Sequence, residues 1–483
     1  MPATVARRMP RRAPIHRAVL RPDRRTLFHI GIVAVVCYLA WRAVEAFGRP
    51  YTFFDMKIYH GAMVWWTSGG ELYEYVAPET TLGFTYPPFA ALVMLPMAGL
   101  PVAVTGWINL VGSVAALALI LVALLRPIAE RAGWPLWFTV AVVLPLALAI
   151  EPARETLGYG QVNLLLFALI MADMVGLRWR SRPGGCQTGG SLRRFWLSGA
   201  WAGAGIGLAT AIKVFPALFI VYLMLTRQWR PAMTALCTAA GVTVATFGIA
   251  GQESTAYFTS ALWQTDRVGV ADATPNQSLA GLLARLYDSL ETPGLLYITF
   301  ALVILVVGLS RAADAHADGD ELAAFTLVGL TANVISPISW SHHLVFVIPA
   351  VIVLVDAAIR RRSASRQFRG ASGAEHPGLS GIGLRSPLWY PTLTGLRHAT
   401  AAVGTYLLFL VSPIWAYEHQ LPQVSHYQDG LFGALMENSL ALTLIVLVAA
   451  LPWRPGAEPA FGPEPHLGRT IAAGPRASLP ARR

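Results

Sequence analysis

The sequence predicts an all-α protein that crosses a membrane many times, with about 12 transmembrane helices. Hydrophobic residues make up 55% of the chain, charged residues only 13%, and the mean hydropathy is +0.52. A soluble protein of 483 residues would need far more charge to cover its surface. Long apolar runs also recur along the chain, separated by loops that alternate between basic and less basic composition. These observations predict a polytopic membrane protein.

The apolar runs define the expected helices, since about 20 mostly apolar residues are needed to cross a bilayer. The candidate spans are residues 27–47, 103–125, 134–150, 161–177, 198–212, 213–226, 232–250, 296–310, 322–336, 343–359, 397–413 and 431–452. They place one transmembrane domain at 27–452, between a basic tail at 1–26 and a tail at 453–483. Both tails are rich in Arg and Pro and are predicted to be disordered. The run from Leu27 to Ala46 has no small-residue cleavage site after it and predicts a signal anchor.

Loop charge predicts the orientation, because Lys and Arg are enriched in cytoplasmic loops. Eight arginines precede the first span, and the loops at 126–133, 178–196, 227–231 and 360–397 are basic. The intervening loops at 48–85, 151–160, 251–295, 337–342 and 414–430 contain fewer basic residues. We therefore expect a multi-pass plasma-membrane protein with both ends in the cytoplasm. Segments 48–101 and 251–295 would then form an extracytoplasmic roof over an active site.

Three segments are neither simple spans nor short loops. Residues 198–226 have basic loops on both sides, which predicts a tight helical hairpin with Lys213 near its outer tip. The stretch from Pro87 to Pro101 is apolar but short, and predicts a re-entrant or interfacial segment. Loop 360–397 is rich in Arg, Ser and Gly, and predicts a flexible cytoplasmic insertion.

Charge and cysteine content exclude several functions. The net charge of +11 comes from tails and short loops, which is typical of anchors against anionic lipid and not of a nucleic-acid surface. The spacing of Cys37, Cys186 and Cys237 indicates neither a metal site nor a disulfide framework. No phosphate-binding loop or dinucleotide fingerprint is present in the sequence, so no cofactor is expected.

Asp55 is the first candidate for chemistry, because it follows the first span almost directly. A carboxylate at that position can meet a lipid-borne substrate and a polar one together. Tyr59 and His60 follow it at helical spacing. A positioned general base typically accelerates a reaction by about 10²–10⁴-fold. The alternative is an exposed loop carboxylate or a helix N-cap.

Lys213 is the second candidate, since it lies in the middle of apolar residues 198–226. An intramembrane lysine is costly and indicates function by default, with snorkelling to the interface as the alternative. Near the outer leaflet it would suit a lipid phosphate. Further polar candidates are Arg154, in the turn before the fourth span, and Gln161 and Asn163, at the start of that span. For Asn163, hydrogen bonding between helices is the alternative.

The turn from Ser336 to His343 is the third candidate cluster, with Trp340, His342 and His343. The histidines could be acid–base groups, donors to phosphate or metal ligands. Adjacent histidines on a helix point about 100° apart, and no Cys or carboxylate is near them in the sequence, so we discount a metal. Amide side chains at Asn276 and Gln277, in the second predicted extracytoplasmic segment, could bind sugar hydroxyls.

The order and spacing of six short motifs resemble the actinobacterial polyprenol-phosphate-mannose-dependent α-1,2-mannosyltransferases, membrane glycosyltransferases of the GT-C class. The motifs are Asp55-Met-Lys-Ile-Tyr59, Phe84-Thr-Tyr-Pro-Pro-Phe-Ala-Ala91, Gly160-Gln-Val-Asn-Leu-Leu165, Ala211-Ile-Lys-Val-Phe-Pro216, Asn276-Gln-Ser-Leu-Ala-Gly281 and Ser336-Pro-Ile-Ser-Trp-Ser-His-His343. The first motif departs from the usual Asp-Leu-x-Val-Tyr of that family. The resemblance implies a GT-C-like helical bundle with its active site in the extracytoplasmic loops.

The resemblance also implies a reaction. Mannose would pass from polyprenyl phosphate mannose to a glycolipid of the phosphatidylinositol mannoside or lipomannan type. Because the donor is β-linked and the product α-linked, the reaction would invert. Asp55 would match the catalytic base and the His342–His343 turn the active-site histidine region, with the acting histidine left open. Lys213, Arg154 or a histidine would assist the departing phosphate. The alternatives are another polyprenyl-phosphate-sugar-dependent glycosyltransferase, or a transporter or flippase for a lipid-linked sugar.

Overall fold

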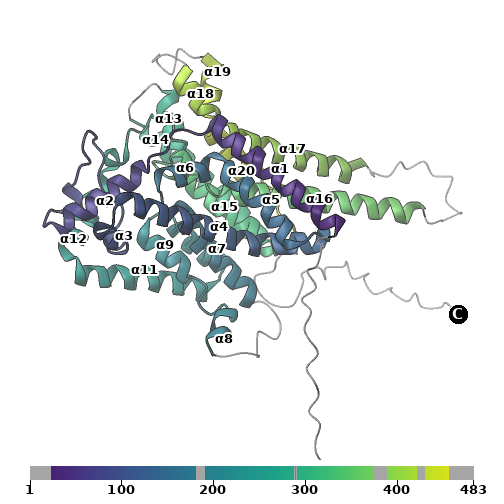
Figure 1. Ribbon diagram of the computed structural model, residues 1–483, viewed down its shortest axis with the longest axis horizontal. Coiled ribbons are helices and arrows are strands. Elements are labelled where there is room, and N and C mark those ends of the chain that lie inside the picture. The colour runs from purple at the N-terminus through teal and green to yellow at the C-terminus, as the bar shows by residue number, and fades with distance from the viewer. Residues whose placement is uncertain are drawn as a thin grey trace, which may run out of the picture.

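A computed structural model describes residues 23–180, 191–287, 289, 291–373, 389–420 and 430–455 (Figure 1). In these residues the regular structure is helical, and strand pairing is limited to isolated bridges between Val76 and Gly83 and between Asn276 and Trp340. The predicted all-α class is therefore confirmed. Most of the predicted basic tail at 1–26, most of the tail at 453–483, and Cys186 lie outside the described residues.

Several helices are long and apolar enough to cross a membrane. They are α1 (Arg24–Phe47), α4 (Val102–Ala132), α11 (Trp229–Ile249), α14 (Gly294–Ala317) and the run Gly395–Trp415. Two bent pairs add to these if each pair is one span: α5 (Leu136–Ala149) with α6 (Glu151–Tyr159), bent by 71°, and α19 (Gly430–Glu437) with α20 (Ser439–Ala450), bent by 68°. The chain is a multi-pass membrane protein. The predicted number of crossings, about 12, stays a prediction, because several expected spans are short helices here.

The remaining elements are short helices and helices of the core. The α-helices are α2 (Phe54–Thr67), α3 (Pro88–Met94), α7 (Asn163–Arg180), α8 (Ser191–Leu197), α9 (Ala204–Ile212), α10 (Ala217–Leu225), α12 (Gly251–Thr259), α13 (Leu279–Leu286), α15 (Glu321–Ile335), α16 (Val347–Gly373), α17 (Trp389–Val411) and α18 (Pro413–Gln420). The 3-10 turns are η1 (Leu72–Glu74), η2 (Leu95–Gly99), η3 (Ala261–Trp263), η4 (Thr265–Val268) and η5 (Ser341–His343).

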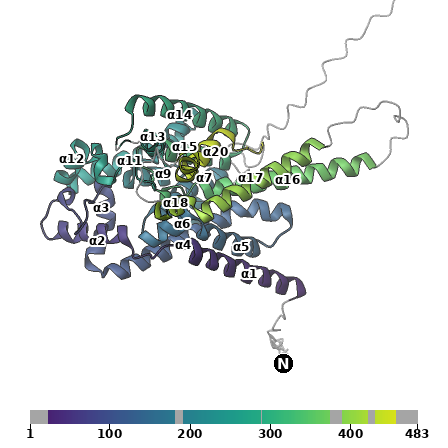
Figure 2. The same ribbon diagram turned by 90° about the horizontal axis from the view of Figure 1, so that it is seen from above.

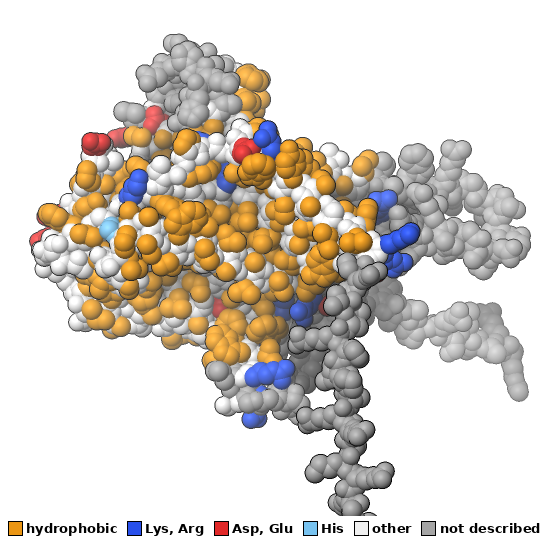
Figure 3. All heavy atoms as spheres, in the orientation of Figure 1, with side chains coloured by type: hydrophobic (Ala, Val, Ile, Leu, Met, Phe, Trp, Pro, Cys, Tyr) orange, Lys and Arg blue, Asp and Glu red, His pale blue; other side chains and the backbone are white. Residues whose placement is uncertain are grey.

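Helix α15 forms the centre of the bundle, since every residue in it except Ile335 is buried. The outer helices α1, α11 and α14 instead expose much of their apolar surface, as expected of helices that face lipid. Hydrophobic side chains cover most of the face in Figure 3. Figure 2 shows α1 and α14 on opposite sides of the bundle. The exposed apolar surface therefore belongs to a membrane environment.

Helices α16 and α17 extend into the predicted loop 360–397, so this loop is shorter than the sequence predicted. They pack against each other and extend beyond the rest of the bundle (Figures 1 and 2). Residues to Gly373 and from Trp389 are helical, so most of the predicted loop 360–397 continues the two helices. Propensity explains the extension of α16, because its residues 360–366 contain four arginines, which favour helix. The part of the predicted insertion at 374–388 lies outside the described residues.

The two predicted roof segments pack together over one end of the bundle. A separate cluster of buried side chains joins α2, η1, α3 and α12. Tyr73 and Tyr257 meet in it, with ring centroids 5.6 Å apart. The stretch between Pro87 and Pro101 forms α3 and η2, too short to span a bilayer, which agrees with the predicted re-entrant or interfacial segment. The packing within this roof fixes the position of α2, and therefore of Asp55.

Candidate active site

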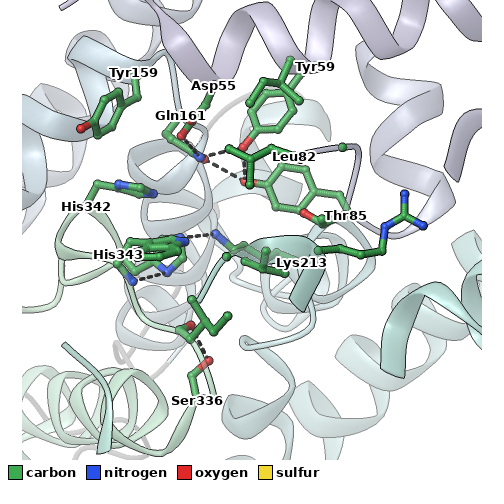
Figure 4. A pocket seen from close by; sticks show the side chains of 18 of the residues that line it. Asp55, Tyr59, Leu82, Thr85, Tyr159, Gln161, Lys213, Ser336, His342 and His343 are labelled. Carbon is green, nitrogen blue, oxygen red and sulfur yellow. Dashed lines mark hydrogen bonds between the residues drawn. The ribbon is translucent and has the colours of Figure 1, made fainter. Parts of the chain in front are cut away.

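A cavity of about 560 Å³ opens under the roof (Figure 4). Its walls come from α2, the segment 82–87, the end of α6, the junction of α9 and α10, the loop before α13, and η5. Seven of the residues singled out from the sequence line it: Asp55, Tyr59, Gln161, Lys213, Trp340, His342 and His343. Segments far apart in the sequence therefore converge on one site.

Asp55 enters the cavity from the first turn of α2. Phe53, two residues before Asp55, has left-handed backbone angles, φ 54° and ψ 46°. Such angles are uncommon for a residue with a bulky side chain. The Phe53 amide donates a hydrogen bond to the carbonyl of Gly158, at 3.0 Å, which ties the start of α2 to α6. The helix N-terminus also favours a negative charge at Asp55.

The Gln161 amide binds the Asp55 carboxylate, and two phenols bind the amide. Gln161 Nε2 donates to Asp55 Oδ2 at 2.5 Å and to the Tyr59 hydroxyl at 2.7 Å. The Tyr86 hydroxyl donates to Gln161 Oε1 at 2.8 Å, which fixes the orientation of the amide. Among the described residues, the side-chain hydrogen bond of Asp55 uses one carboxylate oxygen, Oδ2. The other oxygen is available to take a proton from a substrate.

Burial changes the acidity of Asp55. Loss of hydration raises the pKa of this carboxyl to about 6, while the Gln161 hydrogen bond and the nearby Lys213 act in the opposite direction. A carboxylate with a pKa near 6 is still ionised at neutral pH, and it is a stronger base than an ordinary aspartate. The site therefore suits removal of a proton from a hydroxyl.

Lys213 lies between α9 and α10, where the backbone is extended, with φ −150° and ψ 133°. Its Nζ contacts Asn163 Oδ1 at 3.2 Å and His343 Nε2 at 2.9 Å, and lies 5.2 Å from the centre of the Tyr86 ring. The side chain thus points into the cavity and is held there by polar partners, which argues against simple snorkelling.

The two histidines differ in their contacts. His343 Nδ1 accepts a hydrogen bond from the Trp340 amide at 3.2 Å, so the proton of the neutral ring is on Nε2. That proton can be donated to Lys213 only while the lysine is a neutral amine. A bound phosphate would favour the ammonium and offer it oxygen acceptors in place of the ring. His343 is therefore a partner of Lys213.

His342 instead has one ring nitrogen to which no described residue hydrogen-bonds. Its Nε2 is buried and has no hydrogen-bond partner among the described residues. Its carbonyl accepts bonds from Thr156 Oγ1 at 2.9 Å and Asn163 Nδ2 at 3.0 Å, which fix the residue against α6 and α7. Burial lowers the pKa of His342 well below its ordinary value, so the ring is neutral. A buried polar atom at a cavity wall is suited to a ligand hydroxyl.

Sequence reasoning missed a second charged cluster at the cavity wall. Arg49 Nη2 donates to Glu155 Oε2 at 2.7 Å and to the Tyr159 hydroxyl. The Arg49 guanidinium also lies 3.3 Å from the ring centre of Trp415. Arg49 could have been noticed because it precedes Asp55 by six residues, but Trp415 comes from the distant end of the chain. No local signal links the two.

Four sequence candidates do not line the cavity. Arg154 is buried and donates to Glu151 Oε2 at 2.6 Å and to the carbonyls of Ala149 and Leu410. Asn163 stands behind Lys213 and His342, as described above. Asn276 and Gln277 are buried and hold backbone groups of neighbouring segments, with Asn276 accepting from the Ser339 amide at 2.9 Å and Gln277 donating to the Glu437 carbonyl at 2.8 Å. All four support the wall from behind.

Metal ligands are not assembled here. Among the described residues no group of three His, Cys, Asp or Glu side chains is placed to hold an ion. Among the described residues, the cavity lining contains one carboxylate, Asp55, and three strongly basic side chains: Arg49, Lys213 and Arg267. A base close to cations suits chemistry on an anionic substrate.

Comparison with known proteins identifies the family. The sequence profile described as Glycosyltransferase family 87 matches residues 84–337, more than half of the chain. The chain belongs to glycosyltransferase family 87. As a family 87 glycosyltransferase it is an enzyme, and the transporter alternative is set aside.

Curated relatives of this family 87 enzyme come from mycobacteria. A polyprenol-phosphate-mannose-dependent α-(1-2)-phosphatidylinositol mannoside mannosyltransferase of Mycobacterium tuberculosis H37Rv is 30% identical over 77% of this chain and 87% of its own length. A phosphatidylinositol pentamannoside mannosyltransferase of Mycolicibacterium smegmatis is 31% identical over 69% of this chain and 77% of its own. Among solved structures, ArnT from Cupriavidus metallidurans bound to undecaprenyl phosphate aligns with a TM-score of 0.38 and 14% identity, over 88% of this chain and 76% of that one.

Proposed function

We propose that this family 87 enzyme transfers mannose from polyprenyl phosphate mannose to a phosphatidylinositol mannoside or related mannolipid, forming an α-1,2 linkage with inversion. The observation that carries the proposal is the cavity in which Asp55, the one carboxylate among the described lining residues, lies near Lys213 and the two histidines. The names of the curated relatives support the donor, the acceptor class and the linkage.

The chemistry follows from the arrangement of charges. Asp55 takes the proton from the acceptor hydroxyl as its oxygen attacks the anomeric carbon of mannose. The bond from that carbon to the lipid phosphate breaks, and its electron pair stays on the phosphate oxygen. A phosphate leaves readily without a general acid, so one carboxylate is sufficient. Retention through a covalent intermediate would need a second carboxylate about 5–5.5 Å from the first, and the described lining does not contain one.

Three neighbouring groups have separate roles in this proposal. Lys213 pairs with the phosphate of the donor, and His343 orients Lys213 through its ring. His342, whose Nε2 is buried without a partner among the described residues, donates to or accepts from a sugar hydroxyl. Tyr59 and Gln161, proposed from the sequence as substrate contacts, line the cavity; Gln161 also binds Asp55, and Tyr59 accepts a hydrogen bond from Gln161.

The proposed active site faces the extracytoplasmic side. The ends of α16 and α17 that form most of the predicted basic loop 360–397 lie far from α2 and α12 (Figure 1). The positive-inside rule would put that basic end in the cytoplasm. Cysteines introduced at exposed Glu79 and at Arg194 test this orientation. An impermeant thiol reagent added to intact cells should label the first and not the second.

The proposed reaction is tested directly with the full-length enzyme in membranes. Radiolabelled polyprenyl phosphate mannose is supplied with phosphatidylinositol mannosides of different lengths, and the products are digested with an α-1,2-specific mannosidase. Label should appear in a mannolipid and be released by that enzyme. Transfer only from a different polyprenyl-linked sugar would favour the alternative glycosyltransferase and contradict the proposed donor.

A further inference from the structure

A third strongly basic residue lines the cavity at a distance from the Arg49 cluster. Arg267 belongs to η4, in the loop between α12 and α13. Its Nη2 donates to the carbonyl of Tyr73, and its Nη1 contacts Gln264 Oε1 at 3.4 Å. These contacts fix the guanidinium at the rim of the roof and leave several of its five N–H groups for a ligand.

Gly83 gives the guanidinium its space. A Cβ at position 83 would lie 3.2 Å from Arg267 Nη2 and 2.4 Å from the carbonyl oxygen of Tyr75. Gly83 is two residues from Thr85, which Figure 4 shows on the side of the pocket away from Tyr159 and His342, with Lys213 between. Arg267 therefore approaches the pocket from the Thr85 side, and Arg49 from the Tyr159 side.

The two arginines differ in their charge balance. Arg49 forms an ion pair with Glu155 at 2.7 Å. Within the described part of the chain, no carboxylate lies within 4.0 Å of a nitrogen of Arg267. An arginine is always charged, whereas Lys213 can be a neutral amine in its contact with His343. Arg267 is thus a positive charge on the pocket wall that none of the described carboxylates pairs with.

We propose that Arg267 binds the phosphate of the polyprenyl donor and stabilises the charge that it gains as mannose leaves. The inference rests on the proposed function. The donor phosphate is a diester with one negative charge, and the departing polyprenyl phosphate is a monoester that can carry two. Lys213 matches the first charge and Arg267 the second. An interaction that strengthens as the bond breaks accelerates the chemical step and not only binding.

The planar guanidinium suits this role. Arginine can contact two phosphate oxygens at once, while lysine acts as a point charge. Held by the Tyr73 carbonyl, Arg267 is already oriented before a ligand arrives. The arrangement also predicts that the free product, polyprenyl phosphate, binds more tightly than the donor and inhibits the enzyme.

The test compares Arg267→Gln and Arg267→Lys with the wild type and with Arg42→Gln. Arg42 makes an exposed ion pair with Glu45 on α1, outside the site, so its variant controls for loss of an arginine. For Arg267→Gln we expect kcat to fall by about 10- to 100-fold, with inhibition by polyprenyl phosphate weakened by a similar factor. The KM for the acceptor should change by less than about twofold, and Arg267→Lys should restore part of kcat.

Other outcomes separate this inference from the proposed function. If Arg267→Gln raises the acceptor KM and leaves product inhibition unchanged, the residue binds the acceptor phosphate, and the inference is wrong. Kinetics equal to wild type would also overturn it. Thermal unfolding in detergent checks that Arg267→Gln is folded. A wild-type enzyme that transfers no mannose from polyprenyl phosphate mannose would instead refute the proposed function itself.

Discussion

Two buried polar networks at opposite ends of α15 differ in how completely their groups are paired. Asp320 precedes α15 and Ser336 follows it, so the ends are about 24 Å apart at 1.5 Å per residue. At the first end, Arg454 binds Asp320 at 2.6 Å and Asp356 at 2.8 Å, and Arg360 also binds Asp356. At the second end lies the cavity with Asp55.

The difference concerns atoms left without partners. Within the described residues, none of the buried side-chain nitrogen or oxygen atoms of Arg454, Asp320 and Asp356 lacks a hydrogen bond. At the cavity, Arg49 Nε and His342 Nε2 are buried and have no hydrogen-bond partner among the described residues. Buried polar groups are almost always satisfied in folded proteins. The unpartnered atoms of Arg49 and His342 belong to residues that line the cavity, so a ligand can supply the partners that the described protein does not.

The largest effect on activity is expected from Asp55→Asn. The amide keeps the size of the side chain but cannot accept the proton, so transfer should fall by about 10²–10⁴-fold. Steady-state transfer in membranes, normalised to the abundance of the protein, measures this loss. A variant of normal abundance with near wild-type turnover would remove Asp55 as the base.

The complete network predicts an effect on stability instead. Arg454→Gln leaves Asp320 and Asp356 with fewer partners in a buried site, so the free energy of unfolding should fall by about 3–5 kcal/mol. Thermal unfolding in detergent, compared with the exposed control Arg42→Gln, reports the loss. The substrate KM of the protein that remains folded should not change. A KM shift with unchanged stability would contradict the distinction between the two networks.

Lys213→Met tests the cavity with a smaller expected effect. Methionine keeps the apolar volume but removes a charge-assisted contact to phosphate, worth about 1.5–3 kcal/mol. The affinity for polyprenyl phosphate mannose should fall by about 10- to 100-fold, while Lys213→Arg should rescue it only in part because the guanidinium needs more room. Unchanged donor kinetics would restore the snorkelling interpretation.

The smallest predicted effect is a shift in pH dependence. Since Asp55 acts as the ionised base and its pKa is raised to about 6, kcat/KM should rise as pH increases through about 6 and level off above it. Gln161→Met removes a hydrogen bond that lowers this pKa, so the midpoint should move to higher pH. A pH–rate profile of each protein gives the midpoints. A shift to lower pH would show that Gln161 does not stabilise the carboxylate.

The sequence predicted the fold class and the centre of the site, but not its walls. Asp55, Lys213 and the histidine pair stand out because polar groups next to apolar spans are costly without a function. The same reasoning singled out Arg154, yet α6 turns its guanidinium to Glu151, behind the cavity. A sequence shows that a polar residue needs a partner, and only packing decides whether that partner is protein or ligand.

The missed residues follow the same rule. Arg49 and Arg267 lie in segments between longer helices, where an arginine by itself does not indicate a site. Tyr86 lies within a motif that was singled out, but nothing in the sequence shows that its hydroxyl meets Gln161. Trp415 reaches the cavity only because the Gly395–Trp415 run ends beside α6. These contacts depend on long-range packing, which local sequence patterns do not encode.

The stereochemistry of the product distinguishes inversion with Asp55 as base from retention. A single carboxylate at Asp55 allows one displacement at the anomeric carbon, so a β-linked donor must give an α-linked product. The wild-type enzyme is incubated with β-polyprenyl phosphate mannose labelled with carbon-13 at the anomeric position, and the one-bond carbon–hydrogen coupling of the product is read by NMR. With Asp55 as the base, we expect an α-mannoside. A β-mannoside would mean retention through a second nucleophile, and would contradict the role assigned to Asp55.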